Sequence, residues 1–140
     1  MSGERVNVLK RRSEDFLKLA KELIDRKMLD IASFSVHQAC QLRIKASLLR
    51  LTGSIPRTHG IRELMGLLAN SLEEEGFKQL AEDVRDFVKR YRDTLIDVEY
   101  SYTESRYGLA SLPQSTVNRM VGVAEELFKF LEGAEKYVLG

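Results

Sequence analysis

The sequence predicts an all-α protein, an up-and-down bundle of four to five helices. Apolar residues recur every three to four positions through most of the 140 residues. No stretch alternates with a period of two over the length of a strand, and no Asn-Gly or Asp-Gly hairpin signal occurs. Because no linker or internal repeat divides the chain, we expect residues 1–140 to form a single domain.

The first helix is expected from about Glu4 to Arg26, where apolar residues form one seam along the helix. Its end is poorly marked, because neither Gly nor Pro occurs between Asp25 and Asp30. We expect a break within that stretch and a second helix from Met28 to Leu51.

The second helix is apolar on two separate arcs, which is more than the single stripe of a surface helix. We therefore expect it to lie at the centre of the bundle, with neighbours on more than one side. One narrow strip of this helix remains polar, and it consists of His37, Gln38, Gln41 and Lys45.

A connector follows, in which Gly53 favours a helix stop and Pro56 prevents the helix from continuing. Thr58 is a favourable N-cap residue and predicts the start of a third helix, which we expect to end at Gly76.

A fourth helix is expected from Phe77 to about Tyr100, where apolar residues keep a nearly heptad spacing. Residues 100–113 contain Gly108, Pro113 and several Ser and Thr residues, and therefore predict an irregular segment. A fifth helix is expected from Pro113 to about Tyr137.

The composition excludes several classes of function. A net charge of +1 provides no large positive electrostatic potential for the non-specific binding of nucleic acid. The one cysteine, Cys40, lies on an apolar arc and is expected to be a buried structural thiol. We find no signal-peptide pattern and no apolar run long enough to cross a bilayer, so we expect a cytoplasmic protein without a membrane partner.

No common catalytic or cofactor motif is present: the sequence has no GxxxxGK[ST] loop, GxGxxG, HExxH or cysteine pair. The residues four positions from His37 are Ser33 and Gln41, so no carboxylate stands beside it at helical spacing. We therefore expect neither a metal ion nor a cofactor.

Three polar groups are candidates for binding. The polar strip of the second helix offers amides for a base or ribose and a lysine for phosphate, or it is simply the edge of that helix that reaches water. Arg57, Thr58 and His59 precede a helix and are suited to an anion, or they serve only in capping. The segment from Tyr102 to Tyr107 offers aromatic rings and Arg106, or its tyrosines cover the end of the bundle.

At these three places the sequence resembles the HEPN family, the small helical domains of higher eukaryotes and prokaryotes. The second helix resembles the family pattern F..QQA.E...KA.L, in which Gln38, Ala39, Lys45 and Ala46 match and Gln41 replaces the usual Glu. The segment starting at His59 resembles H.I..LL, and residues 102–107 resemble Y...RY. The three motifs occur in order over nearly the whole chain.

The resemblance implies a bundle of four or five helices, often a homodimer. Many family members resemble partners of a separate minimal nucleotidyltransferase in toxin–antitoxin or related two-component systems, and nucleotide binding has been proposed for the family. Other members are metal-independent ribonucleases, which carry an Arg, a polar residue and then a His. Here Arg92 and Asp93 are followed by Asp97 at the His position, and no histidine follows His59. An ionised Asp cannot donate a proton, so the sequence disfavours ribonuclease activity.

Our leading hypothesis is therefore a non-catalytic module that binds a nucleotide or a nucleotide-bearing partner. Lys45 and Arg106 would contact phosphate, and Tyr102 or Tyr107 would stack on the base. Gln38 or Gln41 would hydrogen-bond the ribose or base, with His59 beside them. The alternatives are a divergent ribonuclease that uses Arg92 and Asp97, and a purely structural dimerisation scaffold.

Overall fold

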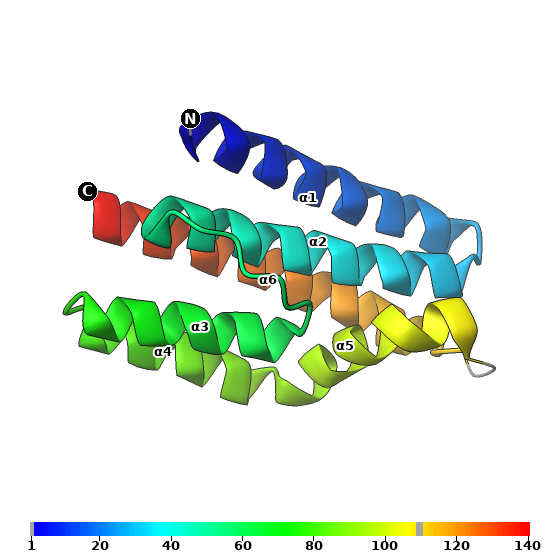
Figure 1. Ribbon diagram of the computed structural model, residues 1–140. Helices are drawn as coiled ribbons and strands as arrows, with labels where there is room; N and C mark the ends of the chain where they lie inside the picture. Colours follow the sequence, from blue (N-terminus) through cyan, green and yellow to red (C-terminus); the bar gives the residue numbers. More distant parts are fainter. Residues whose placement is uncertain (1, 109–110) are drawn as a thin grey trace.

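The computed structural model describes residues 2–108 and 111–140, apart from the side chains of residues 2, 105 and 106. The described chain contains six helices and no strand, which confirms the all-α bundle and corrects the expected number of helices. The helices are α1 (Ser2–Asp25), α2 (Leu29–Thr52), α3 (Ile61–Glu74), α4 (Lys78–Arg90), α5 (Arg92–Tyr107) and α6 (Gln114–Leu139) (Figure 1).

Helix α2 is the centre of the bundle, as its two apolar arcs predicted. It contacts α1, α3, α5 and α6, and α1 runs antiparallel along its length (Figure 1). Its buried residues include polar and charged side chains as well as aliphatic ones. Each of these polar groups must therefore find a partner inside the protein, because water cannot reach most of them.

The break between α1 and α2 is made by a residue other than glycine. Lys27 adopts a left-handed conformation with φ of 62°. The Met28 N–H then donates to the Leu23 carbonyl at 2.9 Å, which satisfies a carbonyl at the end of α1. The end of α2 is conventional, since Gly53 has φ of 82° and donates its N–H to the Leu49 carbonyl.

The expected fourth helix is divided in two at Tyr91, and the expected irregular segment is mostly helical. Helix α5 continues to Tyr107, so only residues between 108 and 113 remain for the connector. The reason is tertiary packing. Val98 and Ser101 are fully buried, and the Ser101 hydroxyl donates to the Ser33 carbonyl of α2 at 3.1 Å. These contacts outweigh the weak helix preference of the Ser and Thr residues.

The expected N-cap at Thr58 is also wrong. Helix α3 begins at Ile61, and Gly60 precedes it without a side-chain cap. The Thr58 hydroxyl is hydrogen-bonded to the Glu63 carboxylate instead.

A buried ion network ties α2 to α1 and α6. The Arg43 guanidinium donates to the Glu135 carboxylate at 2.8 Å, and these side chains are only 4% and 3% exposed. The Ser47 hydroxyl donates to the same carboxylate at 2.6 Å. Lys10 of α1 lies 2.8 Å from Glu135 and 3.1 Å from Glu132. Sequence analysis did not identify this network, because its members are far apart in the chain.

The network determines the charge state of Glu135. Burial by itself would raise the pKa of this carboxyl, but Lys10, Ser47 and Arg43 outweigh that effect and lower it. Glu135 therefore contributes stability that is present above the carboxyl's unfolded pKa. That contribution is lost as the pH falls through the lower folded value.

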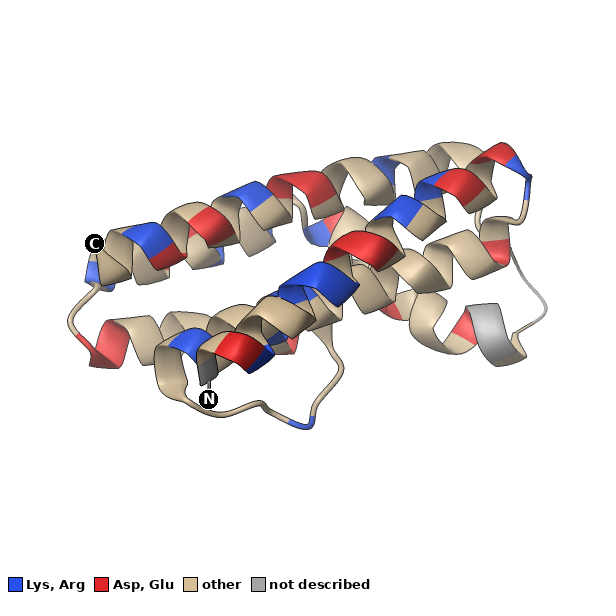
Figure 2. Ribbon diagram, turned by 90° about the horizontal axis from the view of Figure 1, so that it is seen from above, with Lys and Arg blue, Asp and Glu red and all other residues tan. Residues whose placement is uncertain are grey.

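The outer surface is charged, with acidic and basic residues interspersed along the helices (Figure 2). Among the residues that the structure describes, no helix combines the length and the apolar character needed to cross a membrane.

We predict that Arg43→Leu lowers the free energy of unfolding by about 3 kcal/mol, because it leaves Glu135 buried without its guanidinium partner. Urea denaturation at pH 7 measures this. As a control, Lys21→Ala removes an exposed pair with Glu125, for which the expected loss is at most about 1 kcal/mol. Equal losses in the two variants would contradict the assigned role of the buried network.

Candidate functional site

The polar strip of α2 faces α5 and the segment that precedes α3. His37, Gln41 and Lys45 are only 1%, 5% and 8% exposed, and Gln38 is half-buried. Residues three and four positions apart lie on one side of a helix, so the strip can form a continuous set of contacts.

The strip is joined by hydrogen bonds into one chain. The Gln41 side-chain N–H donates to Gln38 Oε1 at 3.1 Å, and Lys45 Nζ donates to Gln41 Oε1 at 3.3 Å. His59, from the segment before α3, is hydrogen-bonded through Nδ1 to the same Gln41 oxygen. The first two candidate groups of the sequence therefore meet in space.

His37 links α2 to the backbone of that segment. Its Nε2 lies 3.1 Å from the His59 carbonyl, and Nδ1 lies 3.3 Å from Gln38 Oε1. Both partners are carbonyl-type oxygens, which can only accept, so a neutral ring can donate to only one of them. The shorter contact assigns the proton to Nε2. Burial lowers the pKa of His37, and it outweighs the hydrogen bonds to Gln38 and His59, which act in the opposite direction. His37 is therefore neutral at pH 7 and donates from Nε2.

Tyr102 brings the third candidate group to the same place. Its ring centroid lies 4.6 Å from that of His37 and 5.4 Å from that of His59. The His59 ring is nearly parallel to Tyr102, at 22°, and Phe34 stacks at 6.1 Å. The residues of this connected set, His37, Gln38, Gln41, Lys45, His59 and Tyr102, are called the His–Gln–Tyr site below.

Glu99 holds the elements around the site in position. Its carboxylate accepts from the Arg62 guanidinium at 2.8 and 3.1 Å and from the Arg62 backbone N–H at 3.0 Å. This carboxylate therefore accepts a hydrogen bond from one of the backbone N–H groups at the start of α3 that have no partner within the helix. The expected anion position at the helix start is thus partly taken by a side chain of the protein itself.

Lys45 is the unusual member of the site. Burial lowers the pKa of its ammonium group. Within the described part of the chain its hydrogen-bond partner is the neutral Gln41 amide, and no carboxylate forms an ion pair with it. The positive charge is therefore buried without a compensating negative charge, which is costly in the absence of an anion.

One of the predicted residues, Tyr107, lies apart from this site. Tyr107 is 75% exposed. It lies five residues after Tyr102 and hence about 140° around the helix from it. The side chain of Arg106 lies outside the described residues. Helix α5 runs antiparallel to α2, so α5 ends towards the start of α2 (Figure 1). Lys45 follows His37 by about two helical turns, in the direction of the other end of α2.

The other pair considered from sequence, Arg92 and Asp97, lines a separate cavity of about 510 Å³ beside the break between α4 and α5. Arg119 of α6 reaches the same cavity, and sequence reasoning missed it because nothing distinguishes it from other exposed basic residues of that helix. The complete lining is Lys89, Arg90, Tyr91, Arg92, Asp93, Thr94, Asp97 and Arg119.

A family model for the HEPN domain matches residues 6–134. The chain belongs to the HEPN domain family. No curated protein matches the chain. In this HEPN domain, the described residues contain no group of three or more His, Cys, Asp or Glu side chains arranged to hold a metal ion.

We predict that His37 titrates below 6.5 and is the neutral Nε2–H tautomer at pH 7. Nitrogen-15 NMR of the two imidazoles measures this, with His59→Gln as the variant that assigns them. Because the folded pKa is lowered, stability should be greatest above the unfolded pKa of about 6.5 and should decrease as the pH falls through the folded value. A His37 that titrates above 6.5 would show that its hydrogen bonds outweigh burial, and would contradict the assignment.

Proposed function

We propose that this HEPN domain binds a nucleotide, or a partner that carries one, at the His–Gln–Tyr site and acts through binding rather than catalysis. The observation that carries the proposal is Lys45, a buried cation for which the described protein supplies only a neutral partner. A phosphate at Lys45 Nζ would provide the missing negative charge. It would also accept charge-assisted hydrogen bonds from the two ammonium protons that Gln41 does not use.

The remaining residues of the site suit the rest of a nucleotide. His59 is exposed, and its ring lies nearly parallel to Tyr102. A purine or pyrimidine ring could take that position on Tyr102 once His59 turns outward, because aromatic side chains stack on every base. Gln38 and Gln41 carry amide donors and acceptors beside this position, as recognition of a base or ribose requires. Arg106 and Tyr107 are not needed in this arrangement.

Family membership supports the choice of partner. We propose a minimal nucleotidyltransferase encoded separately, in a two-component system of the toxin–antitoxin type, with this domain as a homodimer. A nucleotidyltransferase holds a nucleotide during its reaction, so the same ligand could be shared between the two proteins. Co-purification with a nucleotidyltransferase encoded by a neighbouring gene is the direct check.

We predict that Lys45→Met weakens the binding of ATP or GTP by about tenfold or more, as expected for the loss of a charge-assisted hydrogen bond. Isothermal titration calorimetry measures this. The same substitution should raise the thermal stability of the ligand-free protein, because it removes an uncompensated buried charge. The control is Lys129→Met, at a side chain that is 79% exposed. Unchanged affinity in Lys45→Met, or no heat from the wild type at millimolar nucleotide, would contradict the proposal.

A second candidate function is metal-independent RNA cleavage in the cavity beside Arg92. Four basic residues line this cavity, Lys89, Arg90, Arg92 and Arg119, and this arrangement suits an RNA phosphate. Asp97 is the weak point, since an ionised carboxylate cannot donate a proton to the leaving oxygen.

An assay with single-stranded RNA in the presence of EDTA separates the two candidates. Cleavage that is lost in Arg92→Ala and kept in Lys45→Met would favour the ribonuclease. We expect no cleavage by the wild type.

A further inference from the structure

A groove of about 390 Å³ lies at the end of the bundle where three helices finish, away from the His–Gln–Tyr site. Thr52 is the last residue of α2, Glu74 is the last of α3, and Val138 lies in the last turn of α6 (Figure 1). The carboxyl end of a helix carries a partial negative charge, so three such ends make this part of the molecule electronegative.

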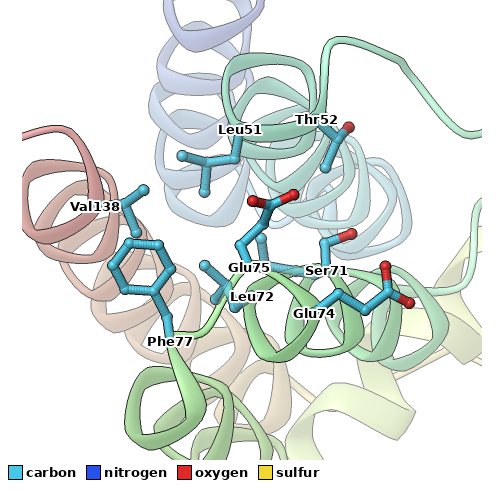
Figure 3. Close-up of a pocket in the computed structure, with 9 residues that line it drawn as sticks. Leu51, Thr52, Ser71, Leu72, Glu74, Glu75, Phe77 and Val138 are labelled. Atoms are coloured by element: carbon cyan, nitrogen blue, oxygen red, sulfur yellow. The ribbon is translucent and has the colours of Figure 1, made fainter.

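The floor of the groove is apolar. Leu68 and Leu72 lie at its base with 0% and 3% exposure, and Leu51, Phe77 and Val138 form half-buried walls. Figure 3 shows the Phe77 ring beside Val138, across the groove from Thr52. The ring centroids of Tyr137 and Phe77 lie 6.2 Å apart, and the two rings meet at 75° in an edge-to-face arrangement.

The turn after α3 forms one wall of the groove. Gly76 has φ of 92°, and its N–H donates to the Glu73 carbonyl, while the Phe77 N–H donates to the Leu72 carbonyl at 2.8 Å. This is the Schellman arrangement, which returns the residue after the glycine to the last turn of the helix. It therefore places Phe77 over Leu72 and leaves Glu75 at the mouth.

The rim of the groove is acidic and unpaired. Glu74 and Glu75 are both exposed, and neither forms an ion pair within the described part of the chain. Their neighbour Glu73 differs, since its carboxylate lies 2.7 Å from Arg85. No Lys or Arg lines the groove. The basic residues that flank its walls in sequence line other cavities. Arg50 and Lys136 do so together with Lys10 and Glu135, and Lys78 does so together with Glu74 and Arg85.

We propose that this groove binds an organic ammonium group attached to an apolar body. The apolar part would cover Leu51, Leu72 and Val138, and the cation would lie between the Glu75 carboxylate and the face of Phe77. Glu74, on the opposite side of the rim, would add negative charge (Figure 3). Carboxylates and an aromatic face both attract a cation, and the volume is within the range of small-ligand sites. An apolar anion would be repelled by the same two carboxylates and by the helix ends.

The test uses n-hexylammonium as the probe and follows backbone amide shifts by NMR. Hexanoate and 1-hexanol serve as the anionic and neutral probes of the same length. We expect hexylammonium to shift the amides of residues 71–77 and 136–139 and to bind more tightly than hexanol, with hexanoate weakest. Equal binding of hexylammonium and hexanol, or no shift in these residues at millimolar probe, would overturn the proposal.

Variants show which groups provide the binding. Glu74→Gln/Glu75→Gln should weaken hexylammonium by about two- to tenfold, as expected for two exposed ion pairs. Glu22→Gln, at an exposed carboxylate of α1, is the matched control and should bind like the wild type. Val138→Trp should fill the groove and abolish the shifts. Undiminished binding in both the Glu74/Glu75 and the Val138 variants would place the ligand elsewhere and overturn the assignment.

A second probe distinguishes the source of the ammonium group. The peptide acetyl-Leu-Lys-Leu-amide presents a lysine between two apolar side chains. If it displaces hexylammonium, the cation is one that a protein segment can provide. If only hexylammonium binds, the groove selects a free amine. Both outcomes support the site, because both require a cation with an apolar body.

Discussion

The enclosure of α2 is the constraint on which the rest of this structure depends. A helix with neighbours on nearly every side cannot leave a polar side chain to water, so each must be paired within the fold. Arg43 and Ser47 meet this requirement through Glu135, and Ser33 and Ser35 donate to carbonyls of their own helix. His37 and Gln41 meet it through the segment before α3. Lys45 donates a hydrogen bond to the neutral Gln41 amide but has no negatively charged partner in the described part of the chain. This missing negative charge distinguishes the candidate site from the Arg43–Glu135 network.

The two polar groups on α2 have different consequences. The Arg43–Glu135 pair is complete, with charges of opposite sign, and it fixes the positions of α1 and α6 against α2. Such a pair specifies an arrangement more than it adds net stability, because desolvation offsets much of the attraction. The His–Gln–Tyr site has neutral partners and one cation, and its exposed side is formed by His59. It is therefore the part of the core that can still gain from a ligand.

Much of this could be predicted from the sequence, and the failures have physical causes. The arcs of α2 predicted its central position, and Gly53 predicted its end, because both depend on local residue types. The end of α1 at Lys27 could not be located, because a left-handed residue other than glycine leaves no signal in the sequence. The extension of α5 past Tyr100 was missed because Ser101 gains its helical position from a contact with Ser33, 68 residues away. The spacing of His37, Gln38 and Gln41 indicated a site, but the contribution of Tyr102 depended on that same unforeseen helix.

Native-state hydrogen exchange across the whole chain tests the enclosure of α2 most directly. If α2 is surrounded as described, its amides from Val36 to Leu48 should be the slowest to exchange. Their opening free energy should equal the global free energy of unfolding measured with denaturant. The amides of the outer helices α1 and α4 should have a lower free energy of opening than those of α2. Exchange of the α2 amides at the rate of those in α1 or α4 would contradict the account.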